Sequence, residues 1–509
     1  MSRRYPPRRY RLDDYKRWFP KTAEVFLRYL KRFGALPVPH VQEGNRVGVV
    51  VVPWVSTPVP WYAIMLAIGL ARRGGKVVLL WDDTGFPEQH RDEQNRAIGR
   101  VLSYVGRFLP VMRLGDESAH PASAADAALI ESLTDQNVTW RLRGAPPTER
   151  DQRLVEKIRT SLTCSLPFVR KALDRTDLDC LVVPGGVYGT SGLFLHEAGA
   201  RGCRVATFDT DRRIGQICVS GVAAQNADIP RAFDALWESG DEARSQAIDI
   251  ALAEFRSRTD RRDGYGFQTL PAGGSGSGAD EGVLMPLNVE WDTAALGRHV
   301  HFVNTVDWIT STITAILDSD AGPVIVRQHP SERRKRQRGK LDIASVLRDR
   351  FRDDPRCRFV AADDAVNTYD LLRSARLVLP FVSTIAIEAA AIGKPVLISG
   401  ASYYADLGFV WSAASRDEYF ALLRRGLQGD LEPLPDQSDR AWISYYLSAV
   451  CNRISTDFTP HPDDFWTWCR RAPDSLFADP EVSDILEAID CDVPVSLLRH
   501  RRISAPNGE

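Results

Sequence analysis

The chain has 509 residues, of which 44% are hydrophobic and 26% are charged, with 65 Lys plus Arg against 66 Asp plus Glu. That length is too great for one ordinary domain and suits two, and the balanced charge excludes the global basic field of nonspecific nucleic-acid binding. No apolar run reaches the roughly 18 residues of a membrane span, the N-terminus lacks the apolar core of a signal peptide, and the eight cysteines include no CxxC pair. We therefore expect a cytoplasmic protein with reduced thiols and no nucleic-acid partner.

Residues 1–40 predict a basic segment followed by a helix from about Lys21 to Phe33. The segment begins MSRRYPPRRYRLDDYKRW, with arginines and lysines among aromatics and prolines. Two interpretations stay open. The segment is either a frayed basic terminus or a peripheral contact with anionic lipid at the inner face of the cell membrane, where polybasic segments gain roughly 1 kcal/mol per charge.

Residues 41–265 predict an N-terminal Rossmann-like domain. The stretch 46–53 reads RVGVVVVP, a continuous apolar strand of the kind that is buried on both faces of a parallel sheet. A helix over 61–73, a Gly-Gly stop and a strand over 76–81 complete a βαβ unit. The same rhythm returns over 181–208, where a strand, a glycine-rich loop, a helix and another strand follow one another.

The glycine-rich loop GGVYGTSG does not carry the dinucleotide-binding fingerprint. Its glycines stand at positions 185, 186, 189 and 192, so GxGxxG is not met. Asp209 stands where the ribose-binding acid of that fingerprint falls, but an acid often ends a strand. We expect a tight loop that faces the acceptor or the other domain, and no cofactor.

A shift in composition marks a linker at 266–282, centred on PAGGSGSGADE. Residues 283–435 then predict a C-terminal Rossmann-like domain that binds the donor, and residues 436–509 predict helices and a tail that pack back across both domains. The predicted fold class is α/β, with two Rossmann-like domains that face an interdomain cleft.

Two strand ends in the C-terminal domain carry polar side chains. The first, VIVRQHP, ends a strand at 324–326 and delivers Arg327, Gln328, His329 and Pro330. The second, LVLPFVST, delivers Ser383 and Thr384 just before an alanine-rich helix. In a doubly wound sheet, ligands bind beyond the carboxyl ends of the strands, and a helix N-terminus there offers N–H groups to a phosphate. The spacing predicts an anion pocket with an imidazole on one wall and a hydroxyl pair on another.

Each of these residues also has a possible structural role that involves no ligand. A single histidine is often structural, although Glu332 is placed to orient the His329 ring. Ser383 and Thr384 also fit the N-cap of the helix, a role compatible with anion binding. Glu388, one turn into that helix, is either an acceptor for ribose hydroxyls or a simple helix-dipole acid.

The second half of the chain resembles bacterial capsule polysaccharide biosynthesis proteins, glycosyltransferases with the two-Rossmann GT-B fold. The resemblance rests on LMPLNVEWDTAALGR (284–298), VDWITSTI (306–313), VRQHPSERR (326–334), VSTIAIEAAAIGKPV (382–396) and SYYADLGF (402–409). Its HP and ST elements are shared with bacterial sialyltransferases and with Kdo transferases that use CMP-sugars. The resemblance implies a donor nucleotide in the C-terminal domain, with His329, Ser383 and Thr384 on its phosphate.

The catalytic candidates are His329, Glu290 and Asp209. His329 would stabilise the charge on a departing nucleotide, and Glu290, in LNVEWD, lies either at an exposed strand end or on the floor of the sugar site. An inverting reaction also needs a base for the acceptor hydroxyl. For that base the N-terminal domain offers His196, Glu197, Asp209 and Asp211, among which the sequence does not choose; Asp209 is carried forward. The acidic base motif of bacterial sialyltransferases is not matched, since Asp82-Asp83-Thr84-Gly85 is interrupted.

The sequence therefore predicts a metal-independent GT-B glycosyltransferase that moves a sugar from a nucleotide donor, CMP-sugar favoured, to a surface or capsular glycan or glycolipid. Asp209-Thr210-Asp211 has the DxD form of a metal site but lies away from the donor pocket, so no metal is predicted. Two alternatives stay open: a polyol-phosphate transferase with a CDP-activated donor, and a noncatalytic nucleotide-sugar-binding assembly protein.

Overall fold

The computed structural model describes residues 12–33, 43–54, 59–84, 91–116, 123–211, 214–223, 227–259, 282–319, 321–334, 338–351, 354–455 and 465–504. The basic residues 1–11 and the predicted linker up to residue 281 lie outside the described residues. No helix in the described part of the chain is long and apolar enough to cross a membrane.

The contacts divide the chain into two compact units. Unit 1 comprises residues 1–137, 149–228 and 452–503, and unit 2 comprises residues 138–148, 229–451 and 504–509. Each unit contains a parallel sheet with helices, so the prediction of two Rossmann-like α/β domains is confirmed. The predicted boundaries differ from this division, because residues 229–259 group with the second unit and residues 452–503 group with the first.

The sheet of unit 1 has the order β11-β6-β5-β4-β1-β2-β3. Its strands are β1 (Arg46–Val51), β2 (Lys76–Trp81), β3 (Val111–Arg113), β4 (Cys180–Pro184), β5 (Arg204–Asp211), β6 (Ile214–Cys218) and β11 (Ile454–Ser455). The five neighbouring strands β5, β4, β1, β2 and β3 are parallel. Strands β6 and β11 extend the sheet beyond β5 in antiparallel pairings. The central strand β1 is an unbroken run of valines around one glycine, and its last five residues are buried, as expected for a strand covered on both faces.

The helices of unit 1 include α1 (Leu12–Leu30), α2 (Val59–Arg72), α3 (Arg91–Val105), α4 (Ala127–Leu142, whose last turn groups with unit 2), α5 (Gln152–Thr176), α6 (Ser191–Ala200), α15 (Phe465–Trp468), α16 (Pro473–Phe477), α17 (Pro480–Cys491) and α18 (Val495–Ser504). Helix α2 is apolar along its length and is buried from Val59 to Ala71. Helix α1 starts earlier than predicted and is part of the core, since Phe19 and Phe26 are buried and pack on Trp61. The two interpretations of the basic segment stay open, because residues 1–11 lie outside the described residues.

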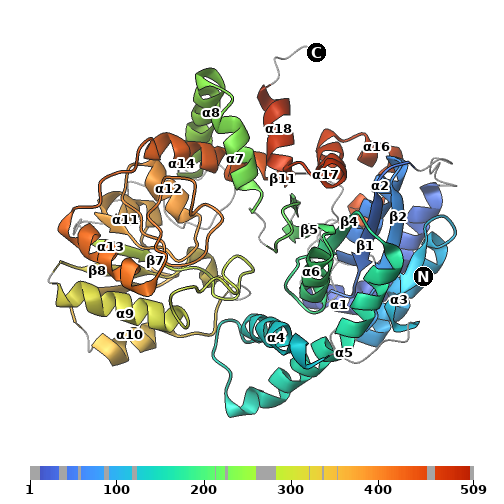
Figure 1. The fold of residues 1–509 in the computed structure, drawn as a ribbon, viewed down its shortest axis with the longest axis horizontal. Helices are drawn as coiled ribbons and strands as arrows, with labels where there is room; N and C mark the ends of the chain where they lie inside the picture. The colour runs from blue at the N-terminus through green and yellow to red at the C-terminus, as the bar shows by residue number, and fades with distance from the viewer. Residues whose placement is uncertain are drawn as a thin grey trace, which may run out of the picture. The chain divides into compact units, whose positions relative to one another are not determined.

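The sheet of unit 2 has the order β10-β7-β8-β9, with all neighbours parallel. Its strands are β7 (Val283–Pro286), β8 (Val324–Arg327), β9 (Cys357–Val360) and β10 (Leu377–Val378). Its helices include α7 (Ile229–Trp237), α8 (Asp241–Thr259), α9 (Thr305–Asp318), α10 (Ile343–Phe351), α11 (Thr368–Ser374), α12 (Ile385–Ala391), α13 (Arg416–Gln428) and α14 (Gln437–Tyr445). Within this unit, α9 and α10 lie on one side of β7 and β8, and α11, α12 and α14 lie on the other (Figure 1).

The strand order of unit 2 locates its ligand-binding edge. The chain runs from β7 to β8 and β9 in one direction and then returns to the other side of β7 with β10. The order therefore reverses between β7 and β10. In open α/β sheets, the crevice beyond the carboxyl ends of the strands at such a reversal is where ligands bind.

Candidate active site

Three segments meet at the carboxyl edge of the unit 2 sheet. They follow β7, β8 and β10, which are neighbours in the sheet. The side chain of Asn288, just after β7, accepts a hydrogen bond from the backbone N–H of Val382 at 3.3 Å. This bond ties the loop that carries Ser383 and Thr384 to the end of the central strand.

His329 is held in one tautomer at the end of β8. Its Nδ1 accepts a hydrogen bond from the backbone N–H of Ser331 at 3.2 Å and lies 2.7 Å from the Ser331 hydroxyl. Pro330 opens the short 3₁₀ turn Pro330–Arg333 that makes this contact possible. Because Nδ1 accepts, the proton of the neutral ring is on Nε2, which makes that atom a donor. The orienting residue is Ser331, and the prediction that Glu332 orients the ring is wrong: its carboxylate accepts from the backbone N–H of Gly339.

The environment of His329 is positively charged. Burial, together with the charges of Arg327 and Arg258, lowers the pKa of His329 to about 4. The imidazole is therefore neutral at pH 7 without a ligand. An anion placed beside it would be attracted by both guanidinium charges and would raise the pKa of the ring again.

Arg327 donates to acceptors of the protein itself. It is 2% exposed, and its guanidinium donates to the carbonyl oxygens of Ala361 and Val366 and to the Thr368 hydroxyl. These bonds give Arg327 a structural role, and its predicted contact with a nucleotide stays a prediction. Arg327 holds the 361–368 loop against the end of β8, and its charge reaches the site only through space.

Replacing Arg327 by methionine is expected to lower the free energy of unfolding by about 2–3 kcal/mol, because two carbonyl oxygens and a hydroxyl lose their donor in a buried place. Nucleotide affinity of the folded variant should fall by less than about tenfold, because only the through-space charge of Arg327 is lost. Chemical denaturation and calorimetric titration of the same preparation check this. A large loss of affinity with unchanged stability would restore the direct contact that the sequence predicted.

Ser383 and Thr384 offer hydroxyl groups that the protein does not use. Thr384 is exposed and precedes α12, but its side chain makes no capping hydrogen bond, so the N-cap alternative is not realised for this residue. The backbone carbonyl of Ser383 accepts from the buried Tyr404 hydroxyl at 2.8 Å, which fixes the loop. Within the described residues, neither side-chain hydroxyl has a recorded partner. Both are therefore available to a ligand.

Glu388 is the ion-pair partner of an arginine. It is 3% exposed, and its carboxylate forms an ion pair with Arg258 at 3.2 Å. Burial alone would lower the pKa of Arg258, but the charges of Glu388 and of the Tyr369 and Tyr445 side chains raise it above its ordinary value. The ion pair positions Arg258, and the acceptor role of Glu388 toward ribose hydroxyls stays a prediction.

Arg258 is the functional candidate that the sequence did not reveal. It comes from α8 and interacts with both His329 and Glu388, so it connects the ends of β8 and α12. Helix α8 is held in place by Phe255, which packs edge-on against Tyr369, Trp442 and Tyr445. The sequence gives no spacing signal for this residue, because its two partners lie 71 and 130 positions further along the chain.

Glu290 belongs to a second polar chain at the same edge. Its carboxylate accepts a hydrogen bond from the Thr305 hydroxyl, and the Thr305 oxygen lies 3.2 Å from His299 Nε2. Gly144, at φ +82°, packs so closely that a Cβ there would stand 2.6 Å from the Glu290 Cβ. Burial raises the pKa of Glu290 to about 7. A carboxyl that titrates near neutral pH suits proton transfer.

The proposed bases of unit 1 differ in their surroundings. Glu197 is bound by Arg170 and Arg201 at 2.9 and 2.7 Å, which makes it a structural ion-pair partner. Asp209 lies on β5, paired with Gln216 of β6, and is half-buried. His196 lies on α6, and the side chain of Asp211 is outside the described set. Asp82, of the interrupted acidic motif, is fully buried against Thr84 and Thr190.

No protein-family model matches the chain, and no curated protein matches it. Among solved structures, it is similar to Thermosulfurimonas dismutans KpsC, beta Kdo 2,4 transferase, with 14% identity, a TM-score of 0.36, and coverage of 57% of this chain and 87% of that one. The beta Kdo 2,7 transferase of the same KpsC gives 15% identity, a TM-score of 0.31, and coverage of 55% and 80%.

UDP-GlcNAc 2-epimerase from Methanocaldococcus jannaschii is also similar, with 12% identity, a TM-score of 0.25, and coverage of 79% of this chain and 99% of that one. These activities belong to the matched proteins. What this chain does has to be argued from its own residues.

Proposed function

We propose that this chain is a GT-B type glycosyltransferase that moves a sugar from a nucleotide-sugar donor to a glycan or glycolipid acceptor of the cell surface. Unit 2 binds the donor at the carboxyl edge of its sheet. A CMP-sugar is the favoured donor, because the HP and ST elements at 329–330 and 383–384 resemble those of transferases that use CMP-sugars. In this proposal the enzyme works in the cytoplasm.

The observation that carries the proposal is the arrangement around His329. Its Nδ1 accepts from Ser331, so Nε2–H is the donor, and the Arg258 guanidinium lies close enough to lower the pKa of the ring. A fixed N–H and a fixed positive charge, both partly removed from water, favour the negative charge that develops on a leaving phosphate. The unused hydroxyls of Ser383 and Thr384 supply further donors.

In this mechanism the leaving phosphate is stabilised by protein groups. Arg258 supplies charge, His329 supplies a hydrogen bond, and Glu388 keeps the arginine in place. Glu290 is the proposed proton carrier of unit 2, because its pKa of about 7 lets it accept or release a proton near neutral pH. Asp209 in unit 1 stays a second candidate for the base that activates the acceptor.

Product analysis tests the function directly. Labelled CMP-, CDP-, UDP- and GDP-linked donors are incubated with the full chain and a glycan acceptor mixture, and the mass gained by the acceptor is measured. Gain of a sugar residue supports the proposal. Gain of a polyol phosphate would favour the CDP-donor alternative, and nucleotide binding with no transfer would favour the noncatalytic assembly protein.

A further inference from the structure

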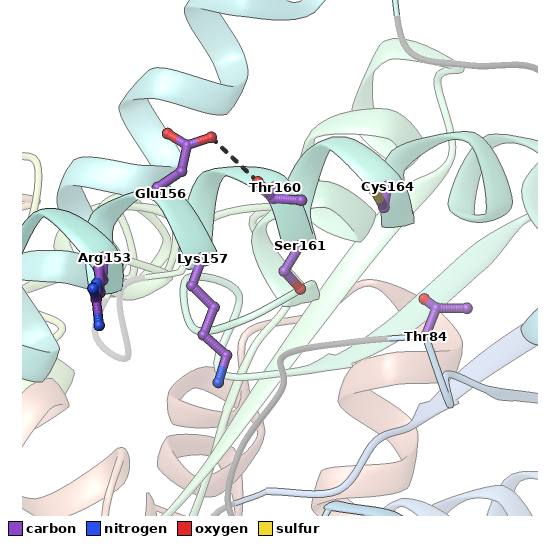
Figure 2. A pocket seen from close by; sticks show the side chains of 7 residues that line it. All are labelled: Thr84, Arg153, Glu156, Lys157, Thr160, Ser161 and Cys164. Carbon is purple, nitrogen blue, oxygen red and sulfur yellow. Dashed lines mark hydrogen bonds between the residues drawn. The ribbon is translucent and has the colours of Figure 1, made fainter.

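A pocket also lies within unit 1. It has a volume of about 480 Å³ and is lined by Thr84, Arg153, Glu156, Lys157, Thr160, Ser161 and Cys164 (Figure 2). All of these except Thr84 come from α5, and Thr84 follows the carboxyl end of β2. The volume is within the range of roughly 300–1,000 Å³ that is typical of small-molecule sites, so the pocket has room for more than a single ion.

The pocket carries net positive charge. Arg153 and Lys157 are exposed and stand one helical turn apart, and neither has an ion-pair partner among the described residues. The acid of the pocket, Glu156, is already used: it pairs with Arg159 at 2.9 Å and accepts from the Thr160 hydroxyl at 3.3 Å. Two unpaired cations one turn apart favour a ligand with negative groups.

The pocket also presents hydroxyl groups beside its cations. In Figure 2, Arg153, Lys157 and Ser161 extend from the same side of α5, the side on which Thr84 lies, while Glu156 extends from the opposite side. The Thr84 hydroxyl is fixed, because it donates to the buried Asp82 at 2.7 Å and lies 3.2 Å from the Ser165 hydroxyl. Cations and fixed hydroxyls together suit a ligand that is both anionic and rich in hydroxyl groups.

We propose that this pocket binds an anionic glycan, namely the acceptor of the transfer reaction. The proposal rests on the function proposed above, and it adds the chemical class of the acceptor. Arg153 and Lys157 would bind carboxylate or phosphate groups of the chain, and Ser161 and Thr84 would contact its sugar hydroxyls. The place fits, because ligands of such sheets gather beyond the carboxyl ends of the strands.

Binding of defined probes to the full chain tests the charge requirement. The probes are hexagalacturonate, neutral maltohexaose of the same length, and inorganic tripolyphosphate. Hexagalacturonate should bind at least tenfold more tightly than maltohexaose, and its affinity should fall as salt is raised. Tripolyphosphate shows whether the two cations prefer phosphate or carboxylate groups. If it binds more tightly than hexagalacturonate, the cations prefer phosphate; if it binds more weakly, they prefer carboxylate.

A matched pair of double variants locates the binding. R153A/K157A removes the two cations of the pocket, and R96A/R100A removes two exposed arginines one turn apart on α3, outside the pocket. All four positions are on the surface, so both proteins should fold with unchanged melting temperature. Affinity for hexagalacturonate should fall about tenfold in R153A/K157A and stay unchanged in R96A/R100A.

A footprint on the wild-type protein needs no variant. Cys164 and Cys491 are both exposed free thiols, but only Cys164 lines the pocket. Saturating hexagalacturonate should slow the alkylation of Cys164 by iodoacetamide at least threefold and leave that of Cys491 unchanged, as read by peptide mass spectrometry.

The proposal is overturned if hexagalacturonate and maltohexaose bind equally, if both double variants lose the same affinity, or if Cys164 is not protected. Nucleotide binding to unit 2, measured in the same preparation, separates the two proposals. If the protein binds nucleotide but shows no preference for hexagalacturonate, only the proposed acceptor site is contradicted. If hexagalacturonate protects Cys164 but the protein binds no nucleotide, the proposed function is contradicted instead.

Discussion

Replacing Arg258 by methionine is expected to lower the free energy of unfolding by about 3 kcal/mol and to weaken nucleotide binding by roughly 30-fold. The stability loss arises because Glu388 stays buried without its counter-charge. The value is at the lower end for buried pairs, since the Arg258 side chain retains 22% exposure. The affinity loss corresponds to about 2 kcal/mol for one hydrogen bond to a charged phosphate. Denaturation with urea and calorimetric titration measure the two quantities.

The double variant R258M/E388M separates the structural part from the functional one. A buried ion pair replaced by apolar side chains of similar length is often neutral or better for stability. The double variant should therefore recover to within about 1 kcal/mol of the wild-type stability and should still bind nucleotide roughly 30-fold more weakly. If affinity recovers together with stability, Arg258 serves only the fold.

Replacing His329 by alanine is expected to reduce kcat by about 10²-fold, because a preorganised donor to the developing charge is lost. The variant H329Q is the matched control. Its amide places an N–H near the position of Nε2 but cannot titrate, so it should retain part of the activity that H329A loses. Initial rates at saturating donor, with melting temperature as a check on folding, give the comparison. Equal activity of H329A and wild type would contradict a role of His329 in the reaction.

The same pair of proteins predicts a pH dependence. Burial lowers the pKa of His329 to about 4 in the free protein, and a bound phosphate raises it, so donor binding takes up a proton. Affinity for the nucleotide-sugar donor should therefore increase as the pH falls from 7 toward 5 in wild type and stay flat in H329Q. The free energy of unfolding changes in the opposite direction over this range. The pKa values of His329 and His299 are depressed in the folded protein, so the stabilisation is present above the ordinary pKa of 6.5 and is lost as the pH falls toward 4.

The regular elements of both units follow directly from sequence pattern. The runs at 47–51 and 283–286 are apolar without alternation, which is the signature of a parallel strand buried on both faces. The glycines at 74 and 75 end a helix where the sequence predicts it, because Gly74 adopts φ +95°. Such signals are local, so these elements can be predicted without knowing which other segments pack against them.

The charged residues of the site follow no local signal. Arg327 ends a strand, and its position alone predicts a ligand contact; the 361–368 loop that covers it comes from a different part of the chain. Glu388 lies one turn into α12, and only the packing of α8 on α14 reveals that Arg258 reaches it. Pairings between residues this distant depend on tertiary contacts that a single sequence does not encode by spacing.

The position of His329 and of the pair Ser383-Thr384 at the carboxyl edge of the sheet could be predicted because each follows a strand. Their detailed state could not. The tautomer of His329 depends on the turn that Pro330 starts, and the availability of the Thr384 hydroxyl depends on a capping bond that does not form. The sequence thus predicts which edge of the sheet carries the proposed donor site, and the contacts in the structure describe the surroundings of each side chain there.

The most direct test of the donor site is calorimetric titration of the full chain with CMP, CDP, UDP and GDP, repeated with H329A. The arrangement of His329 beside Arg258 predicts measurable binding of nucleotides of one base and its loss, by roughly 30-fold or more, in H329A. Absence of binding to any of the four nucleotides, or equal binding by wild type and H329A, would contradict a donor site at this edge of unit 2.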